Sequence, residues 1–410
     1  MDSKQLTLIK EKNFAPCPHT ERTFSSNMSV SPDGKWMAYC TGNVIVLRSL
    51  EDLKSSRIFT EHRDKTSAVS FSPNNYFIAS GDIEGNVKIW FIDDFSMKKD
   101  HKKILSAKIN GIEWDHASEK LFVFGDGKKA FARVISWDTA NNVGEVGAHS
   151  KMILSGDIRK ARPIRLATGG EDNQVNFYEG YPSKFKKMNK EHNNFVTGVK
   201  FSADGNHFVS VGFDKKIVLY DGKSGDVLFT LADGKGDDQH KMAIIGVCWI
   251  DNATLATCSL DRTVKVWDIN DKSCKYTLYP REKSSLDVPD TGCGIVTNGI
   301  YLISLSLNGC LNFWLVSSLT SEKLPDKIID GHQSYISEIL YLPSKSQIIS
   351  SDSNGKIILW NTNEEEYVKT ILNNETQVKQ MAVSRDEDRV YYLNNKGMIR
   401  AIDIQSSAEL

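Results

Sequence analysis

The chain has 410 residues, of which 40% are hydrophobic and 25% are charged, and its formal net charge at pH 7 is −1. This composition is typical of a globular protein with a large core, and the balanced charge gives no support for a nucleic-acid-binding protein. No apolar run approaches the roughly 18 residues that a membrane helix requires, so we expect no membrane contact. Seven widely spaced cysteines without a C-x-x-C pair indicate neither a disulfide framework nor a zinc site, and they fit a reducing cytosol.

A repeat with a spacing of 41 to 47 residues runs along the chain, marked by an aromatic or large apolar residue that closes a strand before a polar turn. The nine markers, called anchors below, are Leu47, Trp90, Trp137, Tyr178, Tyr220, Trp267, Trp314, Trp360 and Ile402. This spacing is that of a four-stranded blade of a β-propeller. It favours a binding or scaffolding protein over an enzyme.

Within each period, two or three short β-rich runs alternate with turns, as at 68–71, 77–80 and 87–90. The first turns of three periods, at 31–34, 72–75 and 202–205, contain Ser, Pro, Asp, Asn and Gly, which accept turn geometry. Helical periodicity is missing, so the sequence predicts an all-β protein.

The sequence predicts nine blades in chain order. Their ranges are 23–62, 63–106, 107–149, 150–192, 193–240, 241–283, 284–332, 333–374 and 375–410. Propellers usually have four to eight blades, so one seven-bladed ring plus two surplus blades fits better than a single nine-bladed ring. We therefore expect an N-terminal strand and extension at 1–22, a seven-bladed propeller at 23–332, and two blades of a partial second propeller at 333–410.

Polar residues recur at fixed distances from the anchors. A hydroxyl lies ten residues before six anchors, at Ser80, Thr168, Ser210, Thr257, Ser304 and Ser350. A polar turn residue lies six before the same anchors, at Glu84, Asp172, Asp214, Asp261, Asn308 and Asn354. Loop histidines precede several of these sets, at His62, His149, His192 and His332. The arrangement resembles the WD40 family, in which a loop His, a strand hydroxyl, a turn Asp and the anchor form a buried hydrogen-bonded network.

The resemblance implies structural tetrads, and the best matches lie in the fourth and fifth repeats. The predicted members are His149, Thr168, Asp172 and Tyr178, then His192, Ser210, Asp214 and Tyr220, with Asp261 and Trp267 in the sixth repeat. A Ser-His-Asp set also suggests a hydrolase. A catalytic triad occurs once and needs an oxyanion hole, whereas these sets recur and lack a nucleophile-elbow sequence, so the structural interpretation is favoured.

Segments outside the repeat pattern resemble the actin-interacting protein 1 family. They are 14–22, 134–138, 144–146, 161–165, 178–180, 185–186 and 302–309. The resemblance implies a cytoplasmic, monomeric regulator at the actin cytoskeleton that binds actin filaments together with ADF/cofilin, promotes filament disassembly and caps barbed ends. It implies no enzymatic activity, cofactor or metal. That family has two seven-bladed propellers, so nine repeats would leave about five blades absent, either by C-terminal truncation or by reduction of the second domain.

The same resemblance implies an actin- and cofilin-binding face around the third to fifth blades. Its members would be Asp126, Lys129, Glu171, Asp172, Lys184, Phe185, Lys186 and Phe195. The chain departs from the family at Ser183, which replaces an aromatic residue, and at Lys129, which replaces an acidic one.

The stretch 181–187 supports a binding role without the family, because it interleaves aromatic residues with lysines and looks longer than a blade requires. Phe185 could serve as an interface anchor, and the lysines could attract an acidic partner. The alternative is that Phe185 packs beneath its own loop. Two other functions remain open: a general WD40 scaffold, and a propeller hydrolase, which would need one non-repeating set of titratable groups near the central channel.

Overall fold

A computed structural model describes residues 15–128, 130–236, 238–363, 366–373 and 377–409. In these residues the chain forms nine antiparallel sheets, eight with four strands and one with three, and its helical segments are three short 3-10 turns. The expected all-β fold is confirmed. The repeat spacing predicts four-stranded blades, and eight of the nine sheets have four strands, although the short β-rich runs in the sequence marked only two or three strands of each.

 The β-rich runs do not mark the fourth strand because this strand is the outermost one and its side chains are largely exposed, as those of Met97–His101 are.

The ring is built from seven sheets, each formed by four strands that are consecutive in the chain. The first three comprise β1 to β4 (Met28–Val30, Trp36–Thr41, Val44–Ser49, Ser56–Phe59), β5 to β8 (Thr66–Phe71, Phe77–Asp82, Val87–Phe91, Met97–His101) and β9 to β12 (Ile109–Trp114, Lys120–Gly125, Ala132–Ser136, Asn142–Glu145). The next two comprise β13 to β16 (Ile153–Ile158, Arg165–Gly170, Val175–Glu179, Lys184–Asn189) and β17 to β20 (Val196–Phe201, His207–Gly212, Ile217–Asp221, Val227–Ala232).

The last two ring sheets and the remaining elements follow in the same order. The ring ends with β21 to β24 (Ile244–Trp249, Thr254–Ser259, Val264–Asp268, Ser273–Leu278) and β25 to β28 (Gly292–Thr297, Tyr301–Ser306, Leu311–Leu315, Lys327–Ile329). The 3-10 turns are η1 (Lys283–Ser285), η2 (Val288–Asp290) and η3 (Val316–Ser318). Two further sheets comprise β29 to β32 (Ile336–Leu342, Gln347–Asp352, Lys356–Asn361, Glu366–Asn373) and β33 to β35 (Val378–Val383, Arg389–Asn394, Ile399–Asp403). Every sheet falls within one of the nine repeat ranges expected from the sequence.

The turns between the first and second strands are held by side chains, as their composition predicts. Ser31 Oγ donates to Asp33 at 2.5 Å and accepts from the amide of Trp36 at 2.9 Å. Ser72 makes the equivalent pair of contacts with Asn74 and Phe77. A serine two residues before Asp or Asn therefore closes the turn and fixes the register of the two strands.

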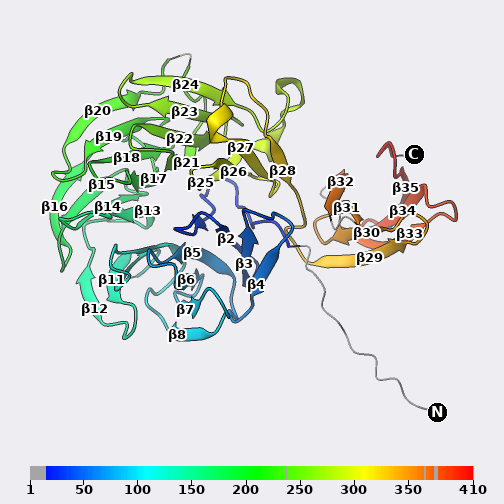
Figure 1. Ribbon diagram of the computed structural model, residues 1–410, viewed down its shortest axis with the longest axis horizontal. Helices are drawn as coiled ribbons and strands as arrows, with labels where there is room; N and C mark the ends of the chain where they lie inside the picture. Colours follow the sequence, from blue (N-terminus) through cyan, green and yellow to red (C-terminus); the bar gives the residue numbers. More distant parts are fainter. Residues whose placement is uncertain (1–14, 129, 237, 364–365, 374–376, 410) are drawn as a thin grey trace, which may run out of the picture.

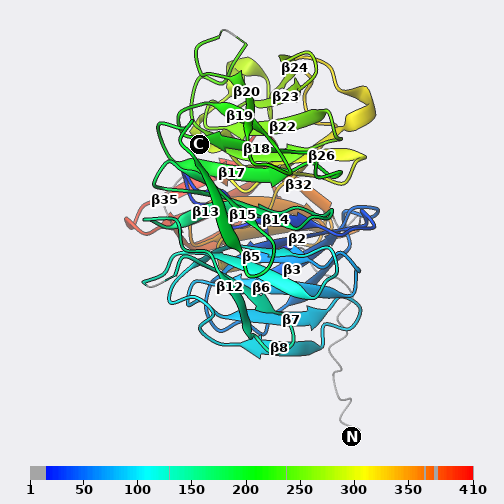
Figure 2. The ribbon, with the colours of Figure 1, turned by 90° about the vertical axis from the view of Figure 1, so that its left-hand side faces the viewer.

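The innermost strands of the seven sheets follow one another around a central channel, and the ring closes where β25 contacts β1. Figure 1 shows this ring, with β29 to β35 beside it. Figure 2 shows the ring from its edge, with the sheets of β5 to β8 and β21 to β24 at opposite sides. The junction also has hydrogen bonds, since the amide of Ser26 donates to the carbonyl of Cys293 at 2.7 Å.

The two sheets β29 to β32 and β33 to β35, called the two-blade unit below, pack on each other through their own apolar core. That core contains Ile349 and Leu359 from the first sheet and Val390, Tyr392 and Ile402 from the second. All five side chains are at most 3% exposed. The anchor Ile402 thus packs toward the preceding sheet, as Trp90 of the second sheet packs on Phe59 of the first.

The described part of the N-terminal extension lies at the junction between the ring and the two-blade unit. The amide of Cys17 donates to the carbonyl of His332 at 2.9 Å, and Gln333 Nε2 donates to the carbonyl of Pro18 at 3.0 Å. Tyr39 in the first sheet donates to the carbonyl of Pro16 at 2.8 Å. The extension therefore joins the first sheet to the start of the two-blade unit. The pairing considered for residues 5–10 lies outside the described residues.

Candidate protein interface

The WD40-type polar networks lie between the sheets, and the fifth sheet has a complete one. His192 Nδ1 lies 3.0 Å from Asp214 Oδ1, and His192 Nε2 lies 2.7 Å from Ser210 Oγ. Ser210 Oγ lies 3.0 Å from the hydroxyl of Tyr220. The histidine side chain is fully buried, so these hydrogen bonds replace water for the polar groups of all four side chains.

The sixth sheet has a complete network whose histidine the sequence analysis missed. His240 lies 2.9 Å from Asp261 and 2.8 Å from Thr257, which accepts a hydrogen bond from Trp267 at 2.9 Å. Burial acts to raise the pKa of Asp261, but the hydrogen bond from His240 outweighs it and lowers the pKa to about 2. The loop histidines lie 27 to 29 residues before their anchors, and this offset identifies His240 in the sequence.

The turn acid was placed wrongly in two sheets. In the second sheet His62 faces Asp82 at 3.5 Å, not Glu84, and in the eighth His332 faces Asp352 at 3.0 Å, not Asn354. Both aspartates end a strand, eight residues before the anchor, and their carboxylates accept backbone amides of the following turn. An acid at either turn position can reach the histidine, so the spacing alone does not select one.

Two other predicted networks are incomplete. In the fourth sheet His149 lies 2.9 Å from Asp172 and 2.8 Å from Thr168. The hydroxyl of Tyr178, however, forms no hydrogen bond of acceptable geometry with any described residue. In the seventh sheet Trp314 Nε1 donates to the carbonyl of Lys323 at 3.2 Å and not to the strand hydroxyl.

Asp172 was expected both in a tetrad and at the binding face. Its side chain is only 4% exposed, and its carboxylate also accepts the amides of Ser150 and Gln174. Because its lone pairs are used inside the blade, the geometry assigns Asp172 to the network and leaves the neighbouring Glu171 nearer the surface.

The other predicted binding residues fall into two groups at opposite ends of the fourth sheet. Glu171 lies in the turn between β14 and β15, whereas Phe185 pairs with Tyr178 near the opposite turn, between β15 and β16. Phe195 immediately precedes β17, at the same end as Glu171, and its carbonyl accepts the amide of Phe213 at 2.9 Å. We call the end with Glu171 and Phe195 the rim, and the strand with Phe185 the outer edge.

A cavity of about 160 Å³ lies at the rim and brings Glu171 and Phe195 together. Phe195 packs edge to face on Phe213 with ring centroids 5.7 Å apart, and both rings line the cavity beside Leu154. Residues 18, 19, 21 and 23–27 of the N-terminal extension line the other side. The rim thus combines an apolar hollow with a carboxylate at its border.

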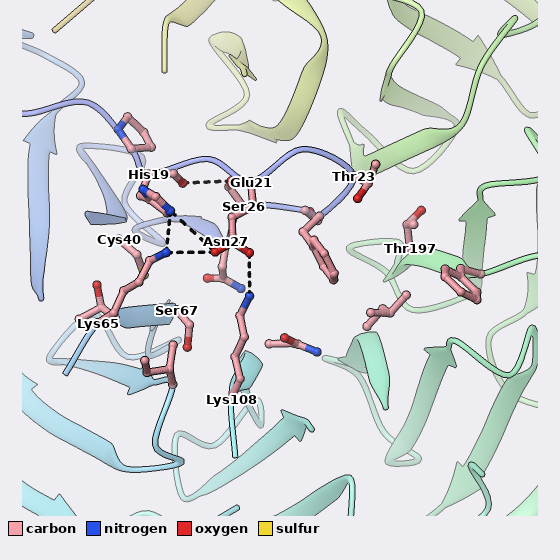
Figure 3. Close-up of a pocket in the computed structure, with 18 of the residues that line it drawn as sticks. His19, Glu21, Thr23, Ser26, Asn27, Cys40, Lys65, Ser67, Lys108 and Thr197 are labelled. Carbon is pink, nitrogen blue, oxygen red and sulfur yellow. Dashed lines mark hydrogen bonds and ion pairs between the residues drawn. The ribbon is translucent and has the colours of Figure 1, made fainter. Parts of the chain in front are cut away.

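A charged cluster borders the same cavity, and Figure 3 shows its residues turned toward one another. Glu21 accepts from Lys65 at 3.0 Å and from Lys108 at 3.3 Å, and His19 Nε2 lies 2.6 Å from Lys65 Nζ. The hydrogen bond from Lys65 lowers the pKa of Glu21 to about 2. Burial and the neighbouring Lys65 lower the pKa of His19. Neutral His19 can accept a hydrogen bond from Lys65. The cluster therefore binds the extension to the rim.

Asp126 lies near this cluster, because its amide donates to the carbonyl of Lys108 at 2.8 Å. Its carboxylate accepts the amide of Gly127 at 2.7 Å, and the residue is half-buried. Lys129, the position of reversed charge, lies outside the described residues.

The stretch 181–187 is not the extra loop that its composition suggested, because β16 (Lys184–Asn189) is the fourth strand of its blade. Phe185 is 45% exposed, and its ring packs edge to face on Tyr178 at 5.8 Å. Lys186 pairs with Glu179 at 3.5 Å, while Lys184 is exposed. One side of the Phe185 ring therefore packs against its own blade, and the other side is exposed to solvent.

The central channel holds a set of charged groups that the sequence analysis did not find. It encloses about 410 Å³ and is lined by Glu113, Asp157, Lys160 and Lys200 among others. Glu113 pairs with Lys200 and, at 3.7 Å, with Lys160. Burial lowers the pKa of Lys200, but Glu113 and Asp157 outweigh burial and raise it above its usual range. The lysine is held as an ammonium ion, which is neither a nucleophile nor a base.

Within the described ranges, no helix is long and apolar enough to cross a membrane. The same residues contain no group of three or more His, Cys, Asp or Glu placed to hold a metal ion.

The repeats, tetrads and closed ring define a WD40-repeat propeller protein. The model of the family described as WD domain, G-beta repeat matches residues 53–90, 183–221, 236–268 and 324–361. The chain is homologous to proteins named WD repeat-containing protein 1 and actin-interacting protein 1. It is 34% identical over 362 residues to WD repeat-containing protein 1 of Gallus gallus, a match that covers 86% of this chain and 57% of the relative.

Two further relatives have similar coverage. Actin-interacting protein 1 of Drosophila melanogaster is 30% identical over 365 residues, covering 88% of this chain and 58% of the relative. Actin-interacting protein 1-2 of Arabidopsis thaliana is 34% identical over 354 residues, a match that covers 85% of this chain and 57% of the relative. The chain thus spans a little over half the length of the curated relatives that it matches.

Proposed function

We propose that this protein binds actin filaments and acts with ADF/cofilin to promote filament disassembly and to cap barbed ends. The observation that carries the proposal is the similarity to actin-interacting proteins over 85 to 88% of the chain, which must include most of the ring. We place the protein at the actin cytoskeleton in the cytoplasm on the same ground.

We propose two contact areas on the fourth blade and its neighbours. One is the rim, with Asp126, Glu171 and Phe195, and the other is the outer edge, with Lys184, Phe185 and Lys186. They lie at opposite ends of one sheet, which suits a partner made of two proteins, such as a filament decorated with cofilin. In this proposal residues 23–332 form the binding domain, and residues 333–410 form a separate unit.

Co-sedimentation with filamentous actin, with and without cofilin, tests the proposal. We expect Phe185→Ala and Phe195→Ala each to weaken binding by about 2 kcal/mol, or roughly 30-fold, as is usual for aromatic anchors. Tyr76→Ala is a matched control, since Tyr76 is 63% exposed and lies in the turn between β5 and β6, away from both areas. Binding that does not depend on cofilin, or filaments that persist in its presence, would contradict the proposal.

A general scaffold for protein complexes is the alternative, and the WD40 matches support it equally well. Affinity capture distinguishes the two, because a scaffold would recover a dominant partner in the absence of actin. A catalytic role finds less support. The Ser-His-Asp sets direct their hydroxyls to the anchors, and the channel lysine is paired with a carboxylate.

A further inference from the structure

The cavity at the rim has the size of a single aromatic ring. It encloses about 160 Å³, and a cavity of about 150 Å³ lined by Leu, Ile and Phe in another protein binds benzene. The apolar side chains that line it are Phe24 of the N-terminal extension, Leu154 of the fourth sheet, and Phe195 and Phe213 at the edge of the fifth. The cavity therefore has room for one ring among apolar side chains.

The aromatic wall of the cavity is held in place from behind. Phe213 packs against Ala243, Ile245 and Leu260, all buried, and its amide donates to the carbonyl of Phe195 at 2.9 Å. Because these contacts already order both rings, binding does not have to immobilise them. Aromatic rings attract one another through their edges and faces in addition to the gain from burial. The wall therefore suits an aromatic side chain better than an aliphatic one.

The charged groups at the border of the cavity differ in their partners. The acidic and basic side chains that line the cavity are His19, Glu21, Lys65, Lys108 and Glu171. Lys65 and Lys108 both donate to Glu21 (Figure 3). Glu171 is half-buried, and its carboxylate forms no hydrogen bond or ion pair with the residues that the structure describes. The carboxylate of Glu171 is therefore the border group left to pair with an opposite charge.

We propose that the rim cavity binds one aromatic side chain of a protein partner and that Glu171 pairs with a lysine or arginine beside it. The ring contributes affinity through burial of its apolar surface. The cation contributes selectivity, since Glu171 is half-buried and its charge is screened less than that of an exposed carboxylate. The segment recognised at the rim thus has an aromatic residue next to a basic one. This inference rests on the proposed function, because it names the chemistry of the partner at that site.

Three small probes with the same aromatic ring test the site in the 410-residue chain by ligand-observed NMR. They are 2-phenylethylamine, which is a cation, 2-phenylethanol, which is neutral, and phenylacetate, which is an anion. The amine should bind about 5-fold more tightly than the alcohol, as one ion pair near a surface allows, and phenylacetate should bind most weakly. Glu171→Gln should reduce the affinity for the amine to that for the alcohol and should leave the alcohol unchanged.

Glu84→Gln is the matched control for the charge. Glu84 lies in the corresponding turn of the second sheet, between β6 and β7, and it pairs with Lys103 at 2.8 Å outside the cavity. The variant removes the same charge from the same face of the ring. It should change the affinity for none of the three probes.

Two further variants test the position of the ring. Leu154→Trp fills the cavity and should abolish binding of all three probes, whereas Phe195→Ala removes part of the aromatic wall and should weaken all three. Thermal unfolding checks that both variants are folded. The proposal would be overturned if the wild-type chain bound none of the probes, if phenylacetate bound more tightly than the amine, or if the folded variants bound the probes as the wild-type chain does.

The probe experiment needs no filaments, so its result is separate from that of co-sedimentation. If Leu154→Trp loses the probes but retains cofilin-dependent binding to filaments, the partner does not use the cavity, and this inference is wrong while the proposed function stands. If the wild-type chain binds the probes in the expected order but does not bind filaments, the cavity is a site for an aromatic and basic segment of another protein, and the proposed function is wrong.

Discussion

The ring and the two-blade unit are built from one repeat but differ in what surrounds it. The eighth sheet has the full polar network, since Trp360 donates to Ser350 at 2.7 Å as Trp267 donates to Thr257 in the ring. Its inner strand nevertheless leaves Tyr341 58% exposed, while Phe201 at the same position in the ring is 6% exposed. The repeat thus determines strands and networks inside a blade, whereas burial of the blade faces depends on neighbours. Two predictions test this difference, and two further predictions test the polar network inside a single blade.

The largest expected difference is in local stability. Ring amides should exchange only by global unfolding, with a free energy of about 5–15 kcal/mol, whereas β33 to β35 should open locally at a free energy nearer zero. Hydrogen exchange of the 410-residue chain measures both regions in one experiment. Equal protection of residues 333–410 and the ring would remove the distinction.

Truncation of an anchor should cost more in the ring than in the two-blade unit. Trp90 is fully buried and stacks on Phe59 with centroids 4.2 Å apart, so Trp90→Ala should lower the free energy of unfolding by about 3–5 kcal/mol. Trp360 is 8% exposed and lies in the sheet β29 to β32 of the two-blade unit. Its replacement by Ala should cost less and should leave ring protection unchanged, as hydrogen exchange combined with urea unfolding can measure.

The parts of the fold that the sequence predicts are those encoded within one repeat. Short β-rich runs predicted the inner strands, and turn residues such as Ser, Pro, Asp, Asn and Gly predicted the turns between them, because each signal depends on residues only a few positions apart. The outer strands were missed because they need apolar residues on neither face, and Lys184–Asn189 therefore looked like a functional loop.

The candidate site was less predictable, because ring closure brings distant residues together. Glu113 and Lys200 are 87 residues apart in the chain and meet across the channel. Glu21 of the extension reaches Lys108 in the same way. No spacing rule indicates such pairs. The resemblance implied one face with Glu171, Phe185 and Phe195, whereas the structure places Phe185 at the opposite end of the fourth sheet from Glu171.

A smaller effect separates the two acids of the second sheet. Asp82 faces His62 and accepts two amides of its turn, whereas Glu84, at the position that the spacing favoured, is exposed and pairs with Lys103. Asp82→Ala should cost about 1–3 kcal/mol because it leaves buried donors unpaired. Glu84→Ala should change stability by less than about 0.5 kcal/mol. Urea unfolding of the two variants gives the comparison, and equal losses would show that Asp82 does not order the turn.

The smallest effect is a pH dependence of the same contact. Burial acts to raise the pKa of Asp82, but hydrogen bonds from His62 and Asn86 outweigh it and lower the pKa from its ordinary 3.8 to about 2. A carboxylate with a lowered pKa stabilises the folded state above pH 3.8, and this contribution is lost as the pH falls toward 2. The stability difference between the wild-type chain and Asp82→Asn should therefore be constant from pH 7 to 5 and should shrink between pH 4 and 2. Urea unfolding at each pH measures it. A difference that stays constant down to pH 2 would assign the stability of the turn to packing instead of charge.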